Sequence, residues 1–207
     1  MRHHDADMDR FGIFDVDWVF GYGSLIWNPE IDYEHAVLAR LHGWHRAFCV
    51  YSRHYRGTAE RPGLVLGLDR GGSCTGVVYR LRDSSRADSI RQLLAREIPD
   101  IDTPVYRPII ASLRYTDEHR RTRTVRALTF AADRDRNTYS RLSDEEILER
   151  LRHCHGQRGP NRDYAINTLR ALEAHGVHDA RLSRLVRRLL AEADDSPARP
   201  APVPAGR

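Results

Sequence analysis

The chain has 207 residues, of which 41% are hydrophobic and 30% charged, and its net charge is +4 at pH 7. These values predict one soluble globular domain, and no apolar run is long enough to span a membrane, so a membrane partner is not expected. All 33 basic residues are arginine, which excludes a Walker lysine, a Schiff base and a lysine general base. Because the arginines are interleaved with 29 acids instead of forming a block, nucleic acid is not expected as a partner either.

Both ends of the chain have a composition that does not favour packing. We expect a flexible N-terminal arm at residues 1–15, a single domain at 16–192, and a disordered tail rich in proline and alanine at 193–207. The polar, acidic start lacks the apolar stretch of a secretory signal, and three cysteines are too few and too odd a set for a disulfide framework. The expected location is therefore the cytoplasm.

Within the domain, strands come first and helices last. Short segments rich in Val, Leu, Ile, Phe and Tyr, separated by turn residues, predict strands at 16–22, 36–51, 64–69, 74–82, 104–115 and 122–131. One helix is predicted among them, at 84–97, and further helices follow a capping-box sequence at 143–146 and carry an apolar stripe at 182–190. This order favours an α+β domain in which a closed or strongly curved sheet has helices packed at its side.

The most informative segment is the turn Gly21-Tyr22-Gly23-Ser24, which ends an apolar strand and precedes Leu25. Glycines let the backbone turn sharply and approach a ligand closely, and exposed amides in such a turn form a concave nest for an anion. The ordinary alternative is a strand-ending turn with Tyr22 in the core. The spacing alone locates a candidate site without identifying its chemistry.

The predicted helix at 84–97 carries a carboxylate beside its apolar face. Glu97 lies at i+3 and i+4 from the last two apolar residues of that face, which consists of Ala87, Ile90, Leu93 and Leu94. Burial and the negative end of the helix dipole would both raise the pKa of Glu97, which suits general acid and base chemistry near neutral pH. The alternative is a buried Glu97 whose pKa is lowered by an arginine, although not by Arg96, because consecutive helical side chains point apart.

Three other patterns have an ordinary structural explanation. His153-Cys154-His155 suggests metal ligands, but neighbours on a helix diverge, and no metal is expected. Cys49 lies in an apolar strand, where a thiol usually packs as a small hydrophobe instead of acting as a nucleophile. Asn161 precedes an apolar helical segment and is predicted to be its N-cap.

Several motifs follow one another in a fixed order: Phe20-Gly21-Tyr22-Gly23-Ser24-Leu25, Leu41-His42-Gly43-Trp44-His45-Arg46, Tyr51-Ser52, Gly57-Thr58, Pro62-Gly63-Leu64-Val65-Leu66-Gly67-Leu68, Gly71-Gly72-Ser73-Cys74-Thr75-Gly76-Val77-Val78-Tyr79-Arg80, Arg96-Glu97 and Gly159-Pro160-Asn161-Arg162-Asp163-Tyr164. In this order they resemble the ChaC-like family of γ-glutamylcyclotransferases that act on glutathione, over about residues 17–190. The resemblance implies a small mixed β-barrel with flanking helices. It also implies a lyase that needs no metal or organic cofactor and releases 5-oxoproline and cysteinylglycine from glutathione.

The same resemblance assigns roles to particular residues. It implies that Glu97 takes a proton from the α-amine of the substrate and later gives one to the leaving amide nitrogen. It implies that the loop with Tyr22 binds the γ-glutamyl group through the amides of Gly23, Ser24 and Leu25, either at the α-carboxylate or at the oxyanion that develops on the γ-carbonyl.

Two further substrate-binding positions are expected. Tyr139 aligns with a tyrosine that the family pattern places beside the catalytic carboxylate, although the usual Gly-Pro after it is absent. Arg53 is the candidate for the glycine carboxylate of glutathione, because a guanidinium fork suits that group; a surface salt bridge is the alternative. Two other functions stay open: a cyclotransferase of the same fold for other γ-glutamyl amines or peptides, and a non-enzymatic, Arg-rich binding protein.

Overall fold

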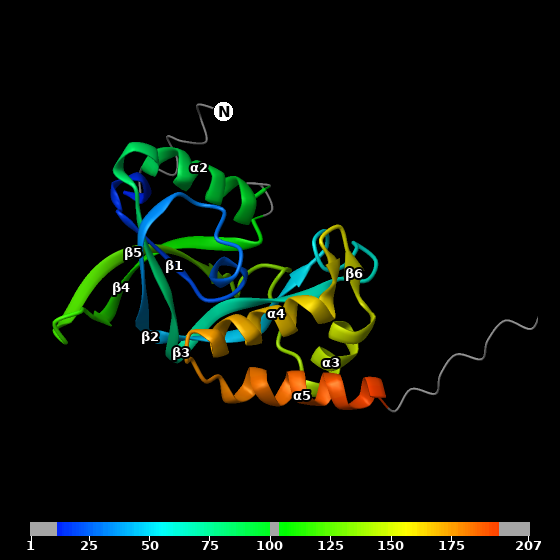
Figure 1. Cartoon of the computed structure of the whole chain (residues 1–207). Coiled ribbons are helices and arrows are strands. Elements are labelled where there is room, and N and C mark those ends of the chain that lie inside the picture. Colours follow the sequence, from blue (N-terminus) through cyan, green and yellow to red (C-terminus); the bar gives the residue numbers. More distant parts are fainter. Residues whose placement is uncertain (1–11, 100–103, 195–207) are drawn as a thin grey trace, which may run out of the picture.

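The computed structural model describes residues 12–99 and 104–194, and in these residues five strands close into a mixed β-barrel (Figure 1). The strands are β1 (Trp18–Gly21), β2 (Tyr33–Ser52), β3 (Gly63–Leu81), β4 (Tyr106–Thr116) and β5 (Thr122–Ala132). They pair antiparallel in the order β1-β3-β2-β4-β5, and parallel pairs between β1 and β5 close the barrel. The prediction of an α+β fold with a small mixed barrel is confirmed.

Strand β3 is longer than the sequence indicates. The segments predicted separately at 64–69 and 74–82 belong to one strand, β3, which pairs along its length with β2. The glycine pair between them, Gly71 and Gly72, has φ of 100° and 70° and lies at a register shift between His42 and Trp44. The break predicted there is therefore wrong, because the glycines form a bulge that bends a continuous strand.

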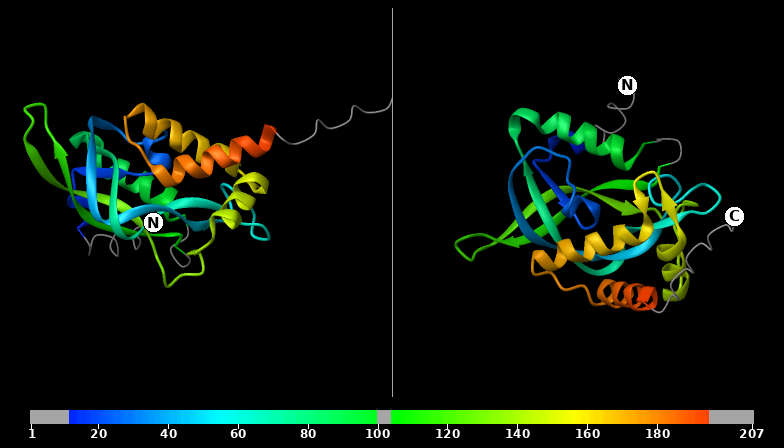
Figure 2. Two further views of the ribbon diagram at one scale, coloured as in Figure 1. Left: turned by 90° about the horizontal axis from the view of Figure 1, so that it is seen from below. Right: turned by 45° about the vertical axis from the view of Figure 1, so that its right-hand side comes forward.

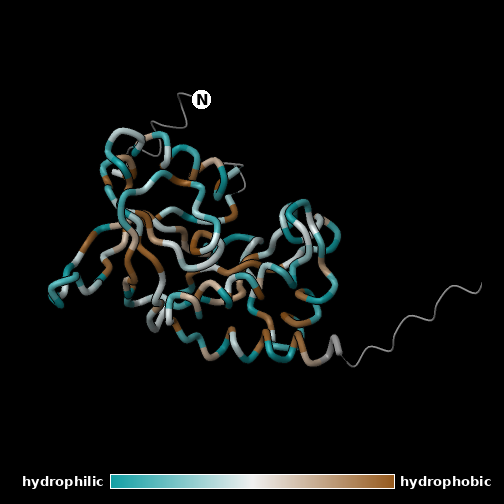
Figure 3. Tube along the Cα trace, viewed as in Figure 1, coloured by the Kyte–Doolittle hydropathy of each residue, from teal (hydrophilic) through white to brown (hydrophobic). Residues whose placement is uncertain are grey.

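Helices cover two sides of the barrel. Helix α2 (Arg86–Glu97) lies on one side, and α3 (Asp144–His153), α4 (Asn161–Ala174) and α5 (Ala180–Asp194) pack together on the other, while the β4–β5 hairpin extends away from the body (Figures 1 and 2). Figure 3 shows hydrophobic residues gathered on the strands and inner helix faces and hydrophilic residues on the outer turns. Each helical layer therefore buries one apolar face against the sheet.

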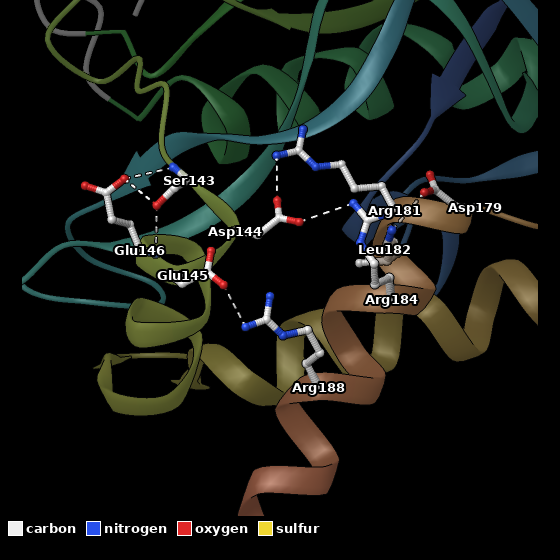
Figure 4. Close-up of polar contacts among 9 residues, drawn as sticks. All are labelled: Ser143, Asp144, Glu145, Glu146, Asp179, Arg181, Leu182, Arg184 and Arg188. Carbon is white, nitrogen blue, oxygen red and sulfur yellow. Dashed lines mark hydrogen bonds and ion pairs between the residues drawn. The ribbon is translucent and has the colours of Figure 1, made fainter.

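Charged residues connect α5 to the start of α3 (Figure 4). Asp144 at the start of α3 accepts hydrogen bonds from Arg181 at 3.1 Å and Arg184 at 3.2 Å, and Glu145 accepts one from Arg188 at 2.8 Å. Beside them Ser143 and the third helical residue form the predicted capping box. These ion pairs connect the first turn of α3 to α5. The acidic side chains in that turn also suit the positive end of the helix dipole of α3.

The predicted boundaries at the chain ends need one correction. Residues Ile13–Asp15 form the short 3-10 helix η1, and Ile13 is 1% exposed in the core that α2 covers. The prediction of a flexible arm is therefore wrong for these residues, because an apolar side chain fixes them to the domain. Residues 193 and 194 belong to α5, and the remainder of the predicted arm and tail lies outside the described residues.

Candidate active site

A cavity of about 790 Å³ opens between the barrel and the α2 and β6–β7 segments, where β6 (His155–Gly156) and β7 (Gly159–Pro160) form a short hairpin. This volume lies within the range of small-molecule sites, roughly 300–1,000 Å³. The wall is formed by residues from segments far apart in the sequence: Ser24, Trp27, Asn28, Glu30, Tyr51, Ser52, Arg53, His54, Tyr55, Arg56, Val65, Arg96, Glu97, Pro99, Val105, Tyr106, Asn137, Thr138, Gln157, Arg158 and Tyr164.

The glycine turn forms one part of this wall. After β1 the chain enters the 3-10 helix η2 (Ser24–Ile26), and Ser24 faces the cavity. A Cβ on Gly21 would lie 2.9 Å from the Cβ of Leu25, so a side chain there would force a shift, and one on Gly23 would lie 3.1 Å from the hydroxyl of Tyr164, a tight contact. The first amides of a helical turn have no partner within the turn, which leaves them able to bind a ligand.

Glu97 forms another part of the cavity wall. It is the last residue of α2, lines the cavity, and has a side chain that is 14% exposed. Its Oε1 lies 3.1 Å from Nε of Arg96. The prediction that Arg96 does not pair with it is wrong, because the helix ends here: Ile98 leaves the helical region with φ −130° and ψ 66°, and the long arginine side chain reaches the neighbouring carboxylate.

Two opposing effects set the charge of this carboxylate. Burial raises the pKa of Glu97, the charges of Arg96 and Arg158 lower it, and the charge of Glu30 raises it; the net effect is a pKa above the ordinary value. The two alternatives drawn from the sequence, burial and pairing with arginine, are thus both present, and burial dominates. A carboxyl group of raised pKa near neutral pH is able both to accept and to donate a proton.

Arg96 connects the two halves of the site. Its guanidinium donates to Oγ of Ser24 at 3.0 Å, to the carbonyl of Asn28 at 2.7 Å, and to Glu30 at 2.9 Å. Its side chain is 9% exposed. One cation therefore holds the glycine turn in place and also contacts Glu97, which brings the two motifs predicted from the sequence into one cavity.

Two of the predicted substrate-binding side chains are not among those that line the cavity. Tyr22 is 5% exposed, does not line the cavity, and donates its hydroxyl to the carbonyl of Phe130 at 2.6 Å, as expected for the alternative of a core residue. Tyr139 donates to Asp69 at 2.9 Å, accepts from Arg141 at 3.0 Å, and likewise does not line the cavity. The role beside the catalytic carboxylate that the family pattern implies for Tyr139 stays a prediction.

The other two predicted substrate-binding side chains, those of Leu25 and Arg53, differ in whether they line the cavity. Leu25 is 5% exposed and packs in the core, and its carbonyl accepts the hydroxyl of Tyr79 at 2.9 Å, so only its backbone remains a candidate contact. Arg53 lines the cavity, and its Nε is buried without a hydrogen-bond partner in the described structure. A buried guanidinium N–H without a partner favours a bound anion over the surface salt bridge that was the alternative.

Tyr164 ends the motif that begins at Gly159, but the sequence pattern indicated no role for its side chain. Its hydroxyl accepts the amide of Leu66 at 3.1 Å and faces the cavity beside Gly23. In the same motif Asn161 is not an N-cap. It is the first residue of α4 and fully buried, accepts from the amide of Leu64 at 2.7 Å and donates to the carbonyl of Leu64 at 2.6 Å. Asn161 therefore fastens α4 to β3 in place of capping the helix.

Two structural features bear on other classes of protein. In residues 12–99 and 104–194, no three or more His, Cys, Asp or Glu side chains are grouped so that they could hold a metal ion. Over the same residues, no helix combines the length and the apolarity that a membrane crossing requires. His153, Cys154 and His155 accordingly form no such group, and Cys154 is buried with its thiol 3.4 Å from the carbonyl of Pro62.

Known proteins share this fold and much of this sequence. A structure titled as the γ-glutamyl cyclotransferase specific to glutathione from yeast matches with a TM-score of 0.75 and 20% identity, covering 84% of this chain and 95% of that one. The glutathione-specific γ-glutamylcyclotransferase of Escherichia coli K12 is 36% identical over 179 residues, 84% of this chain and 74% of that protein. The γ-glutamylcyclotransferase 2-3 of Arabidopsis thaliana is 29% identical over 189 residues, 86% of this chain and 92% of that protein.

The small mixed barrel with flanking helices is the fold of the γ-glutamyl cyclotransferase structure that this chain matches. The family model described as ChaC-like protein matches residues 17–192. The chain therefore belongs to the ChaC-like family, as its motifs indicated.

Proposed function

We propose that this protein degrades glutathione as a lyase, cyclising the γ-glutamyl group and releasing 5-oxoproline and cysteinylglycine. The observation that carries the proposal is the juxtaposition of Ser24 and Glu97 on one cavity wall, joined by Arg96. Family membership and a relative named for glutathione agree with it. The three cysteines are unpaired, which suits the reducing cytoplasm where we expect the protein.

In the proposed reaction the substrate supplies both reacting groups. The α-nitrogen of the γ-glutamyl group attacks its own γ-carbonyl carbon, and the amide bond to cysteine then breaks. The α-ammonium loses one proton to solvent before the attack. Glu97 accepts the second proton, which the α-nitrogen loses as the new C–N bond forms, and gives it to the leaving nitrogen, so the carboxylate is unchanged after a turnover. No protein nucleophile is needed, and folding the γ-glutamyl chain into a near-attack geometry supplies much of the rate acceleration.

The glycine turn and the arginines hold the substrate for this step. We propose that the amides of Gly23, Ser24 and Leu25 bind the α-carboxylate or the developing oxyanion, as exposed amides in a turn do. Arg53, with its buried unpartnered Nε, is proposed to bind the glycine carboxylate. The side chains of Tyr22 and Tyr139 do not line the cavity, so neither is proposed to contact the substrate directly.

The direct test is to incubate the pure protein with glutathione and to measure 5-oxoproline and cysteinylglycine. We expect both products in equal amounts, and a loss of roughly 10²–10⁴-fold in rate for Glu97→Gln, the usual contribution of a general acid–base group. A matched control is Glu149→Gln, because Glu149 lies on α3 with a 56% exposed side chain that pairs with Arg61. This variant should keep full activity.

Other outcomes would replace the proposal. If wild type converts γ-glutamyl amino acids but not glutathione, the protein is a cyclotransferase for other γ-glutamyl amines. If wild type is as inactive as Glu97→Gln on both substrates and binds nucleic acid with steep salt dependence, the fold is a scaffold for binding.

A further inference from the structure

The β6–β7 hairpin is held tightly against the loop between β2 and β3. The amide of Gln157 donates to the carbonyl of His54 at 2.8 Å, and that of Arg158 donates to the carbonyl of Tyr55 at 3.0 Å. A Cβ on Gly156 would lie 2.5 Å from the same His54 carbonyl oxygen, so the two segments leave no room for a side chain between them. The backbone of Arg158 therefore has a fixed position on the cavity wall.

The side chain of Arg158 is also oriented. Its guanidinium carbon lies 4.3 Å from the centre of the Tyr55 ring, and both residues line the cavity. Stacking on an aromatic face uses the flat surface of a guanidinium and leaves the N–H groups at its edge free to donate. Tyr55 thus presents the Arg158 fork at the cavity wall without occupying its hydrogen-bond donors.

The charges around the cavity are not balanced. Four arginines (Arg53, Arg56, Arg96 and Arg158) and two carboxylates (Glu30 and Glu97) line it, which gives 4 − 2 = +2 when all are ionised. Both carboxylates form their ion pairs with Arg96, and Arg56 donates to the carbonyls of residues 158 and 160. Arg158 acts on Glu30 and Glu97 through its charge but forms no ion pair with any described residue, so the wall is complementary to a ligand with more than one carboxylate.

We propose that Arg158, stacked on Tyr55, is a specificity-determining residue that binds the carboxylate at the far end of the substrate, opposite the γ-glutamyl group. It shares this carboxylate with Arg53, because two carboxylate oxygens offer about four acceptor sites. The inference rests on the proposed function and adds a basis for its selectivity: recognition of glutathione depends on the free C-terminal carboxylate, so γ-glutamyl amines and C-terminal amides are poor substrates.

Binding is measured by titration calorimetry in a Glu97→Gln background, where turnover does not interfere. The ligands are glutathione and its C-terminal amide. We expect the starting variant to bind glutathione roughly 10–100-fold more tightly than the amide, the usual effect of a charged hydrogen bond. Arg158→Gln should remove most of that preference by weakening glutathione alone, and Arg158→Lys, which keeps the charge but not the fork, should retain part of it.

The matched control is Arg170→Gln, since Arg170 is an exposed arginine on α4 that does not line the cavity; it should leave both affinities unchanged. The proposal is overturned if Arg158→Gln leaves the preference for glutathione intact, or weakens both ligands equally. Failure of the proposed function gives a different result: an Arg158-dependent preference in binding, with no 5-oxoproline from glutathione in the wild type, leaves the subsite standing and removes the reaction.

Discussion

Replacing Arg96 tests whether a cation controls the proton affinity of the buried carboxylate. In the structure burial and Glu30 raise the pKa of Glu97, and Arg96, with Nε at 3.1 Å, opposes them. Arg96→Gln removes this opposition, so the pKa of Glu97 should rise further. An opposite charge at such a distance lowers a carboxyl pKa by about 1–3 units, or about 1.4–4 kcal/mol. Because the two side chains are only 9% and 14% exposed, salt should screen the effect little.

The assay is the pH dependence of kcat/KM for glutathione, whose acid limb reports the essential base of the free enzyme. Arg96→Gln should move this limb to higher pH by about 1–3 units, and Arg96→Lys should move it less because the cation is kept. Glu30→Gln is a control of opposite sign: it removes a charge that raises the pKa of Glu97 and should move the limb to lower pH.

The reasoning is refuted if the acid limb of Arg96→Gln stays in place or moves to lower pH in a protein whose circular dichroism and thermal unfolding match the wild type. A uniform loss of activity with an unmoved limb would mean that Arg96 acts only by holding Ser24 and the glycine turn.

Three further predictions concern stability. Because the folded pKa of Glu97 is raised, its burial is best tolerated below the unfolded pKa of about 4.3 and costs stability as pH rises through the folded pKa. Glu97→Gln should therefore unfold at an equal or higher temperature than wild type at pH 8, and the difference should shrink at pH 5. A lower unfolding temperature of Glu97→Gln at pH 8 would contradict this. Asn161→Ala leaves the buried amide and carbonyl of Leu64 without hydrogen-bond partners and should lower the free energy of unfolding by about 2–4 kcal/mol in equilibrium urea unfolding. A loss below about 1 kcal/mol would show that β3 rearranges. Burial opposes the charge of Asp144, but two arginines of α5 outweigh it and hold its pKa below the ordinary value, so its stabilisation is present above about pH 4 and is lost as pH falls; Asp144→Asn should cost about 0.5 kcal/mol at low salt and nothing in 1 M NaCl, and a salt-independent loss would point to packing instead.

The parts of the fold that depend on local chemistry were predictable. The capping box at Ser143 forms as expected, and α2 runs over residues 86–97 within the predicted 84–97. The continuity of β3 was not predictable, because a glycine pair is typical of both a turn and a bulge. Gly71 and Gly72 form a bulge only because His42 and Trp44 on β2 pair with residues on either side of them.

The site divides in the same way. Motifs located Ser24 and Glu97, and the structure brings both to one cavity. The directions of Tyr22 and Tyr139 depend on distant partners, the carbonyl of Phe130 and the carboxylate of Asp69, which no local pattern specifies. Asn161 has the right identity and place for an N-cap, but its amide group matches the free backbone groups of a strand nearly a hundred residues earlier.

The pairing of Arg96 with Glu97 has a consequence for the chemistry. A glutamate buried alone would stay protonated at neutral pH and be a poor base, whereas one fully neutralised by arginine would be a poor acid. Here burial is opposed by two cations on different segments, Arg96 on α2 and Arg158 on the hairpin. A carboxylate that binds Arg158 would cancel part of that opposition and raise the pKa of Glu97 in the complex, which favours the protonated form needed when the leaving nitrogen departs.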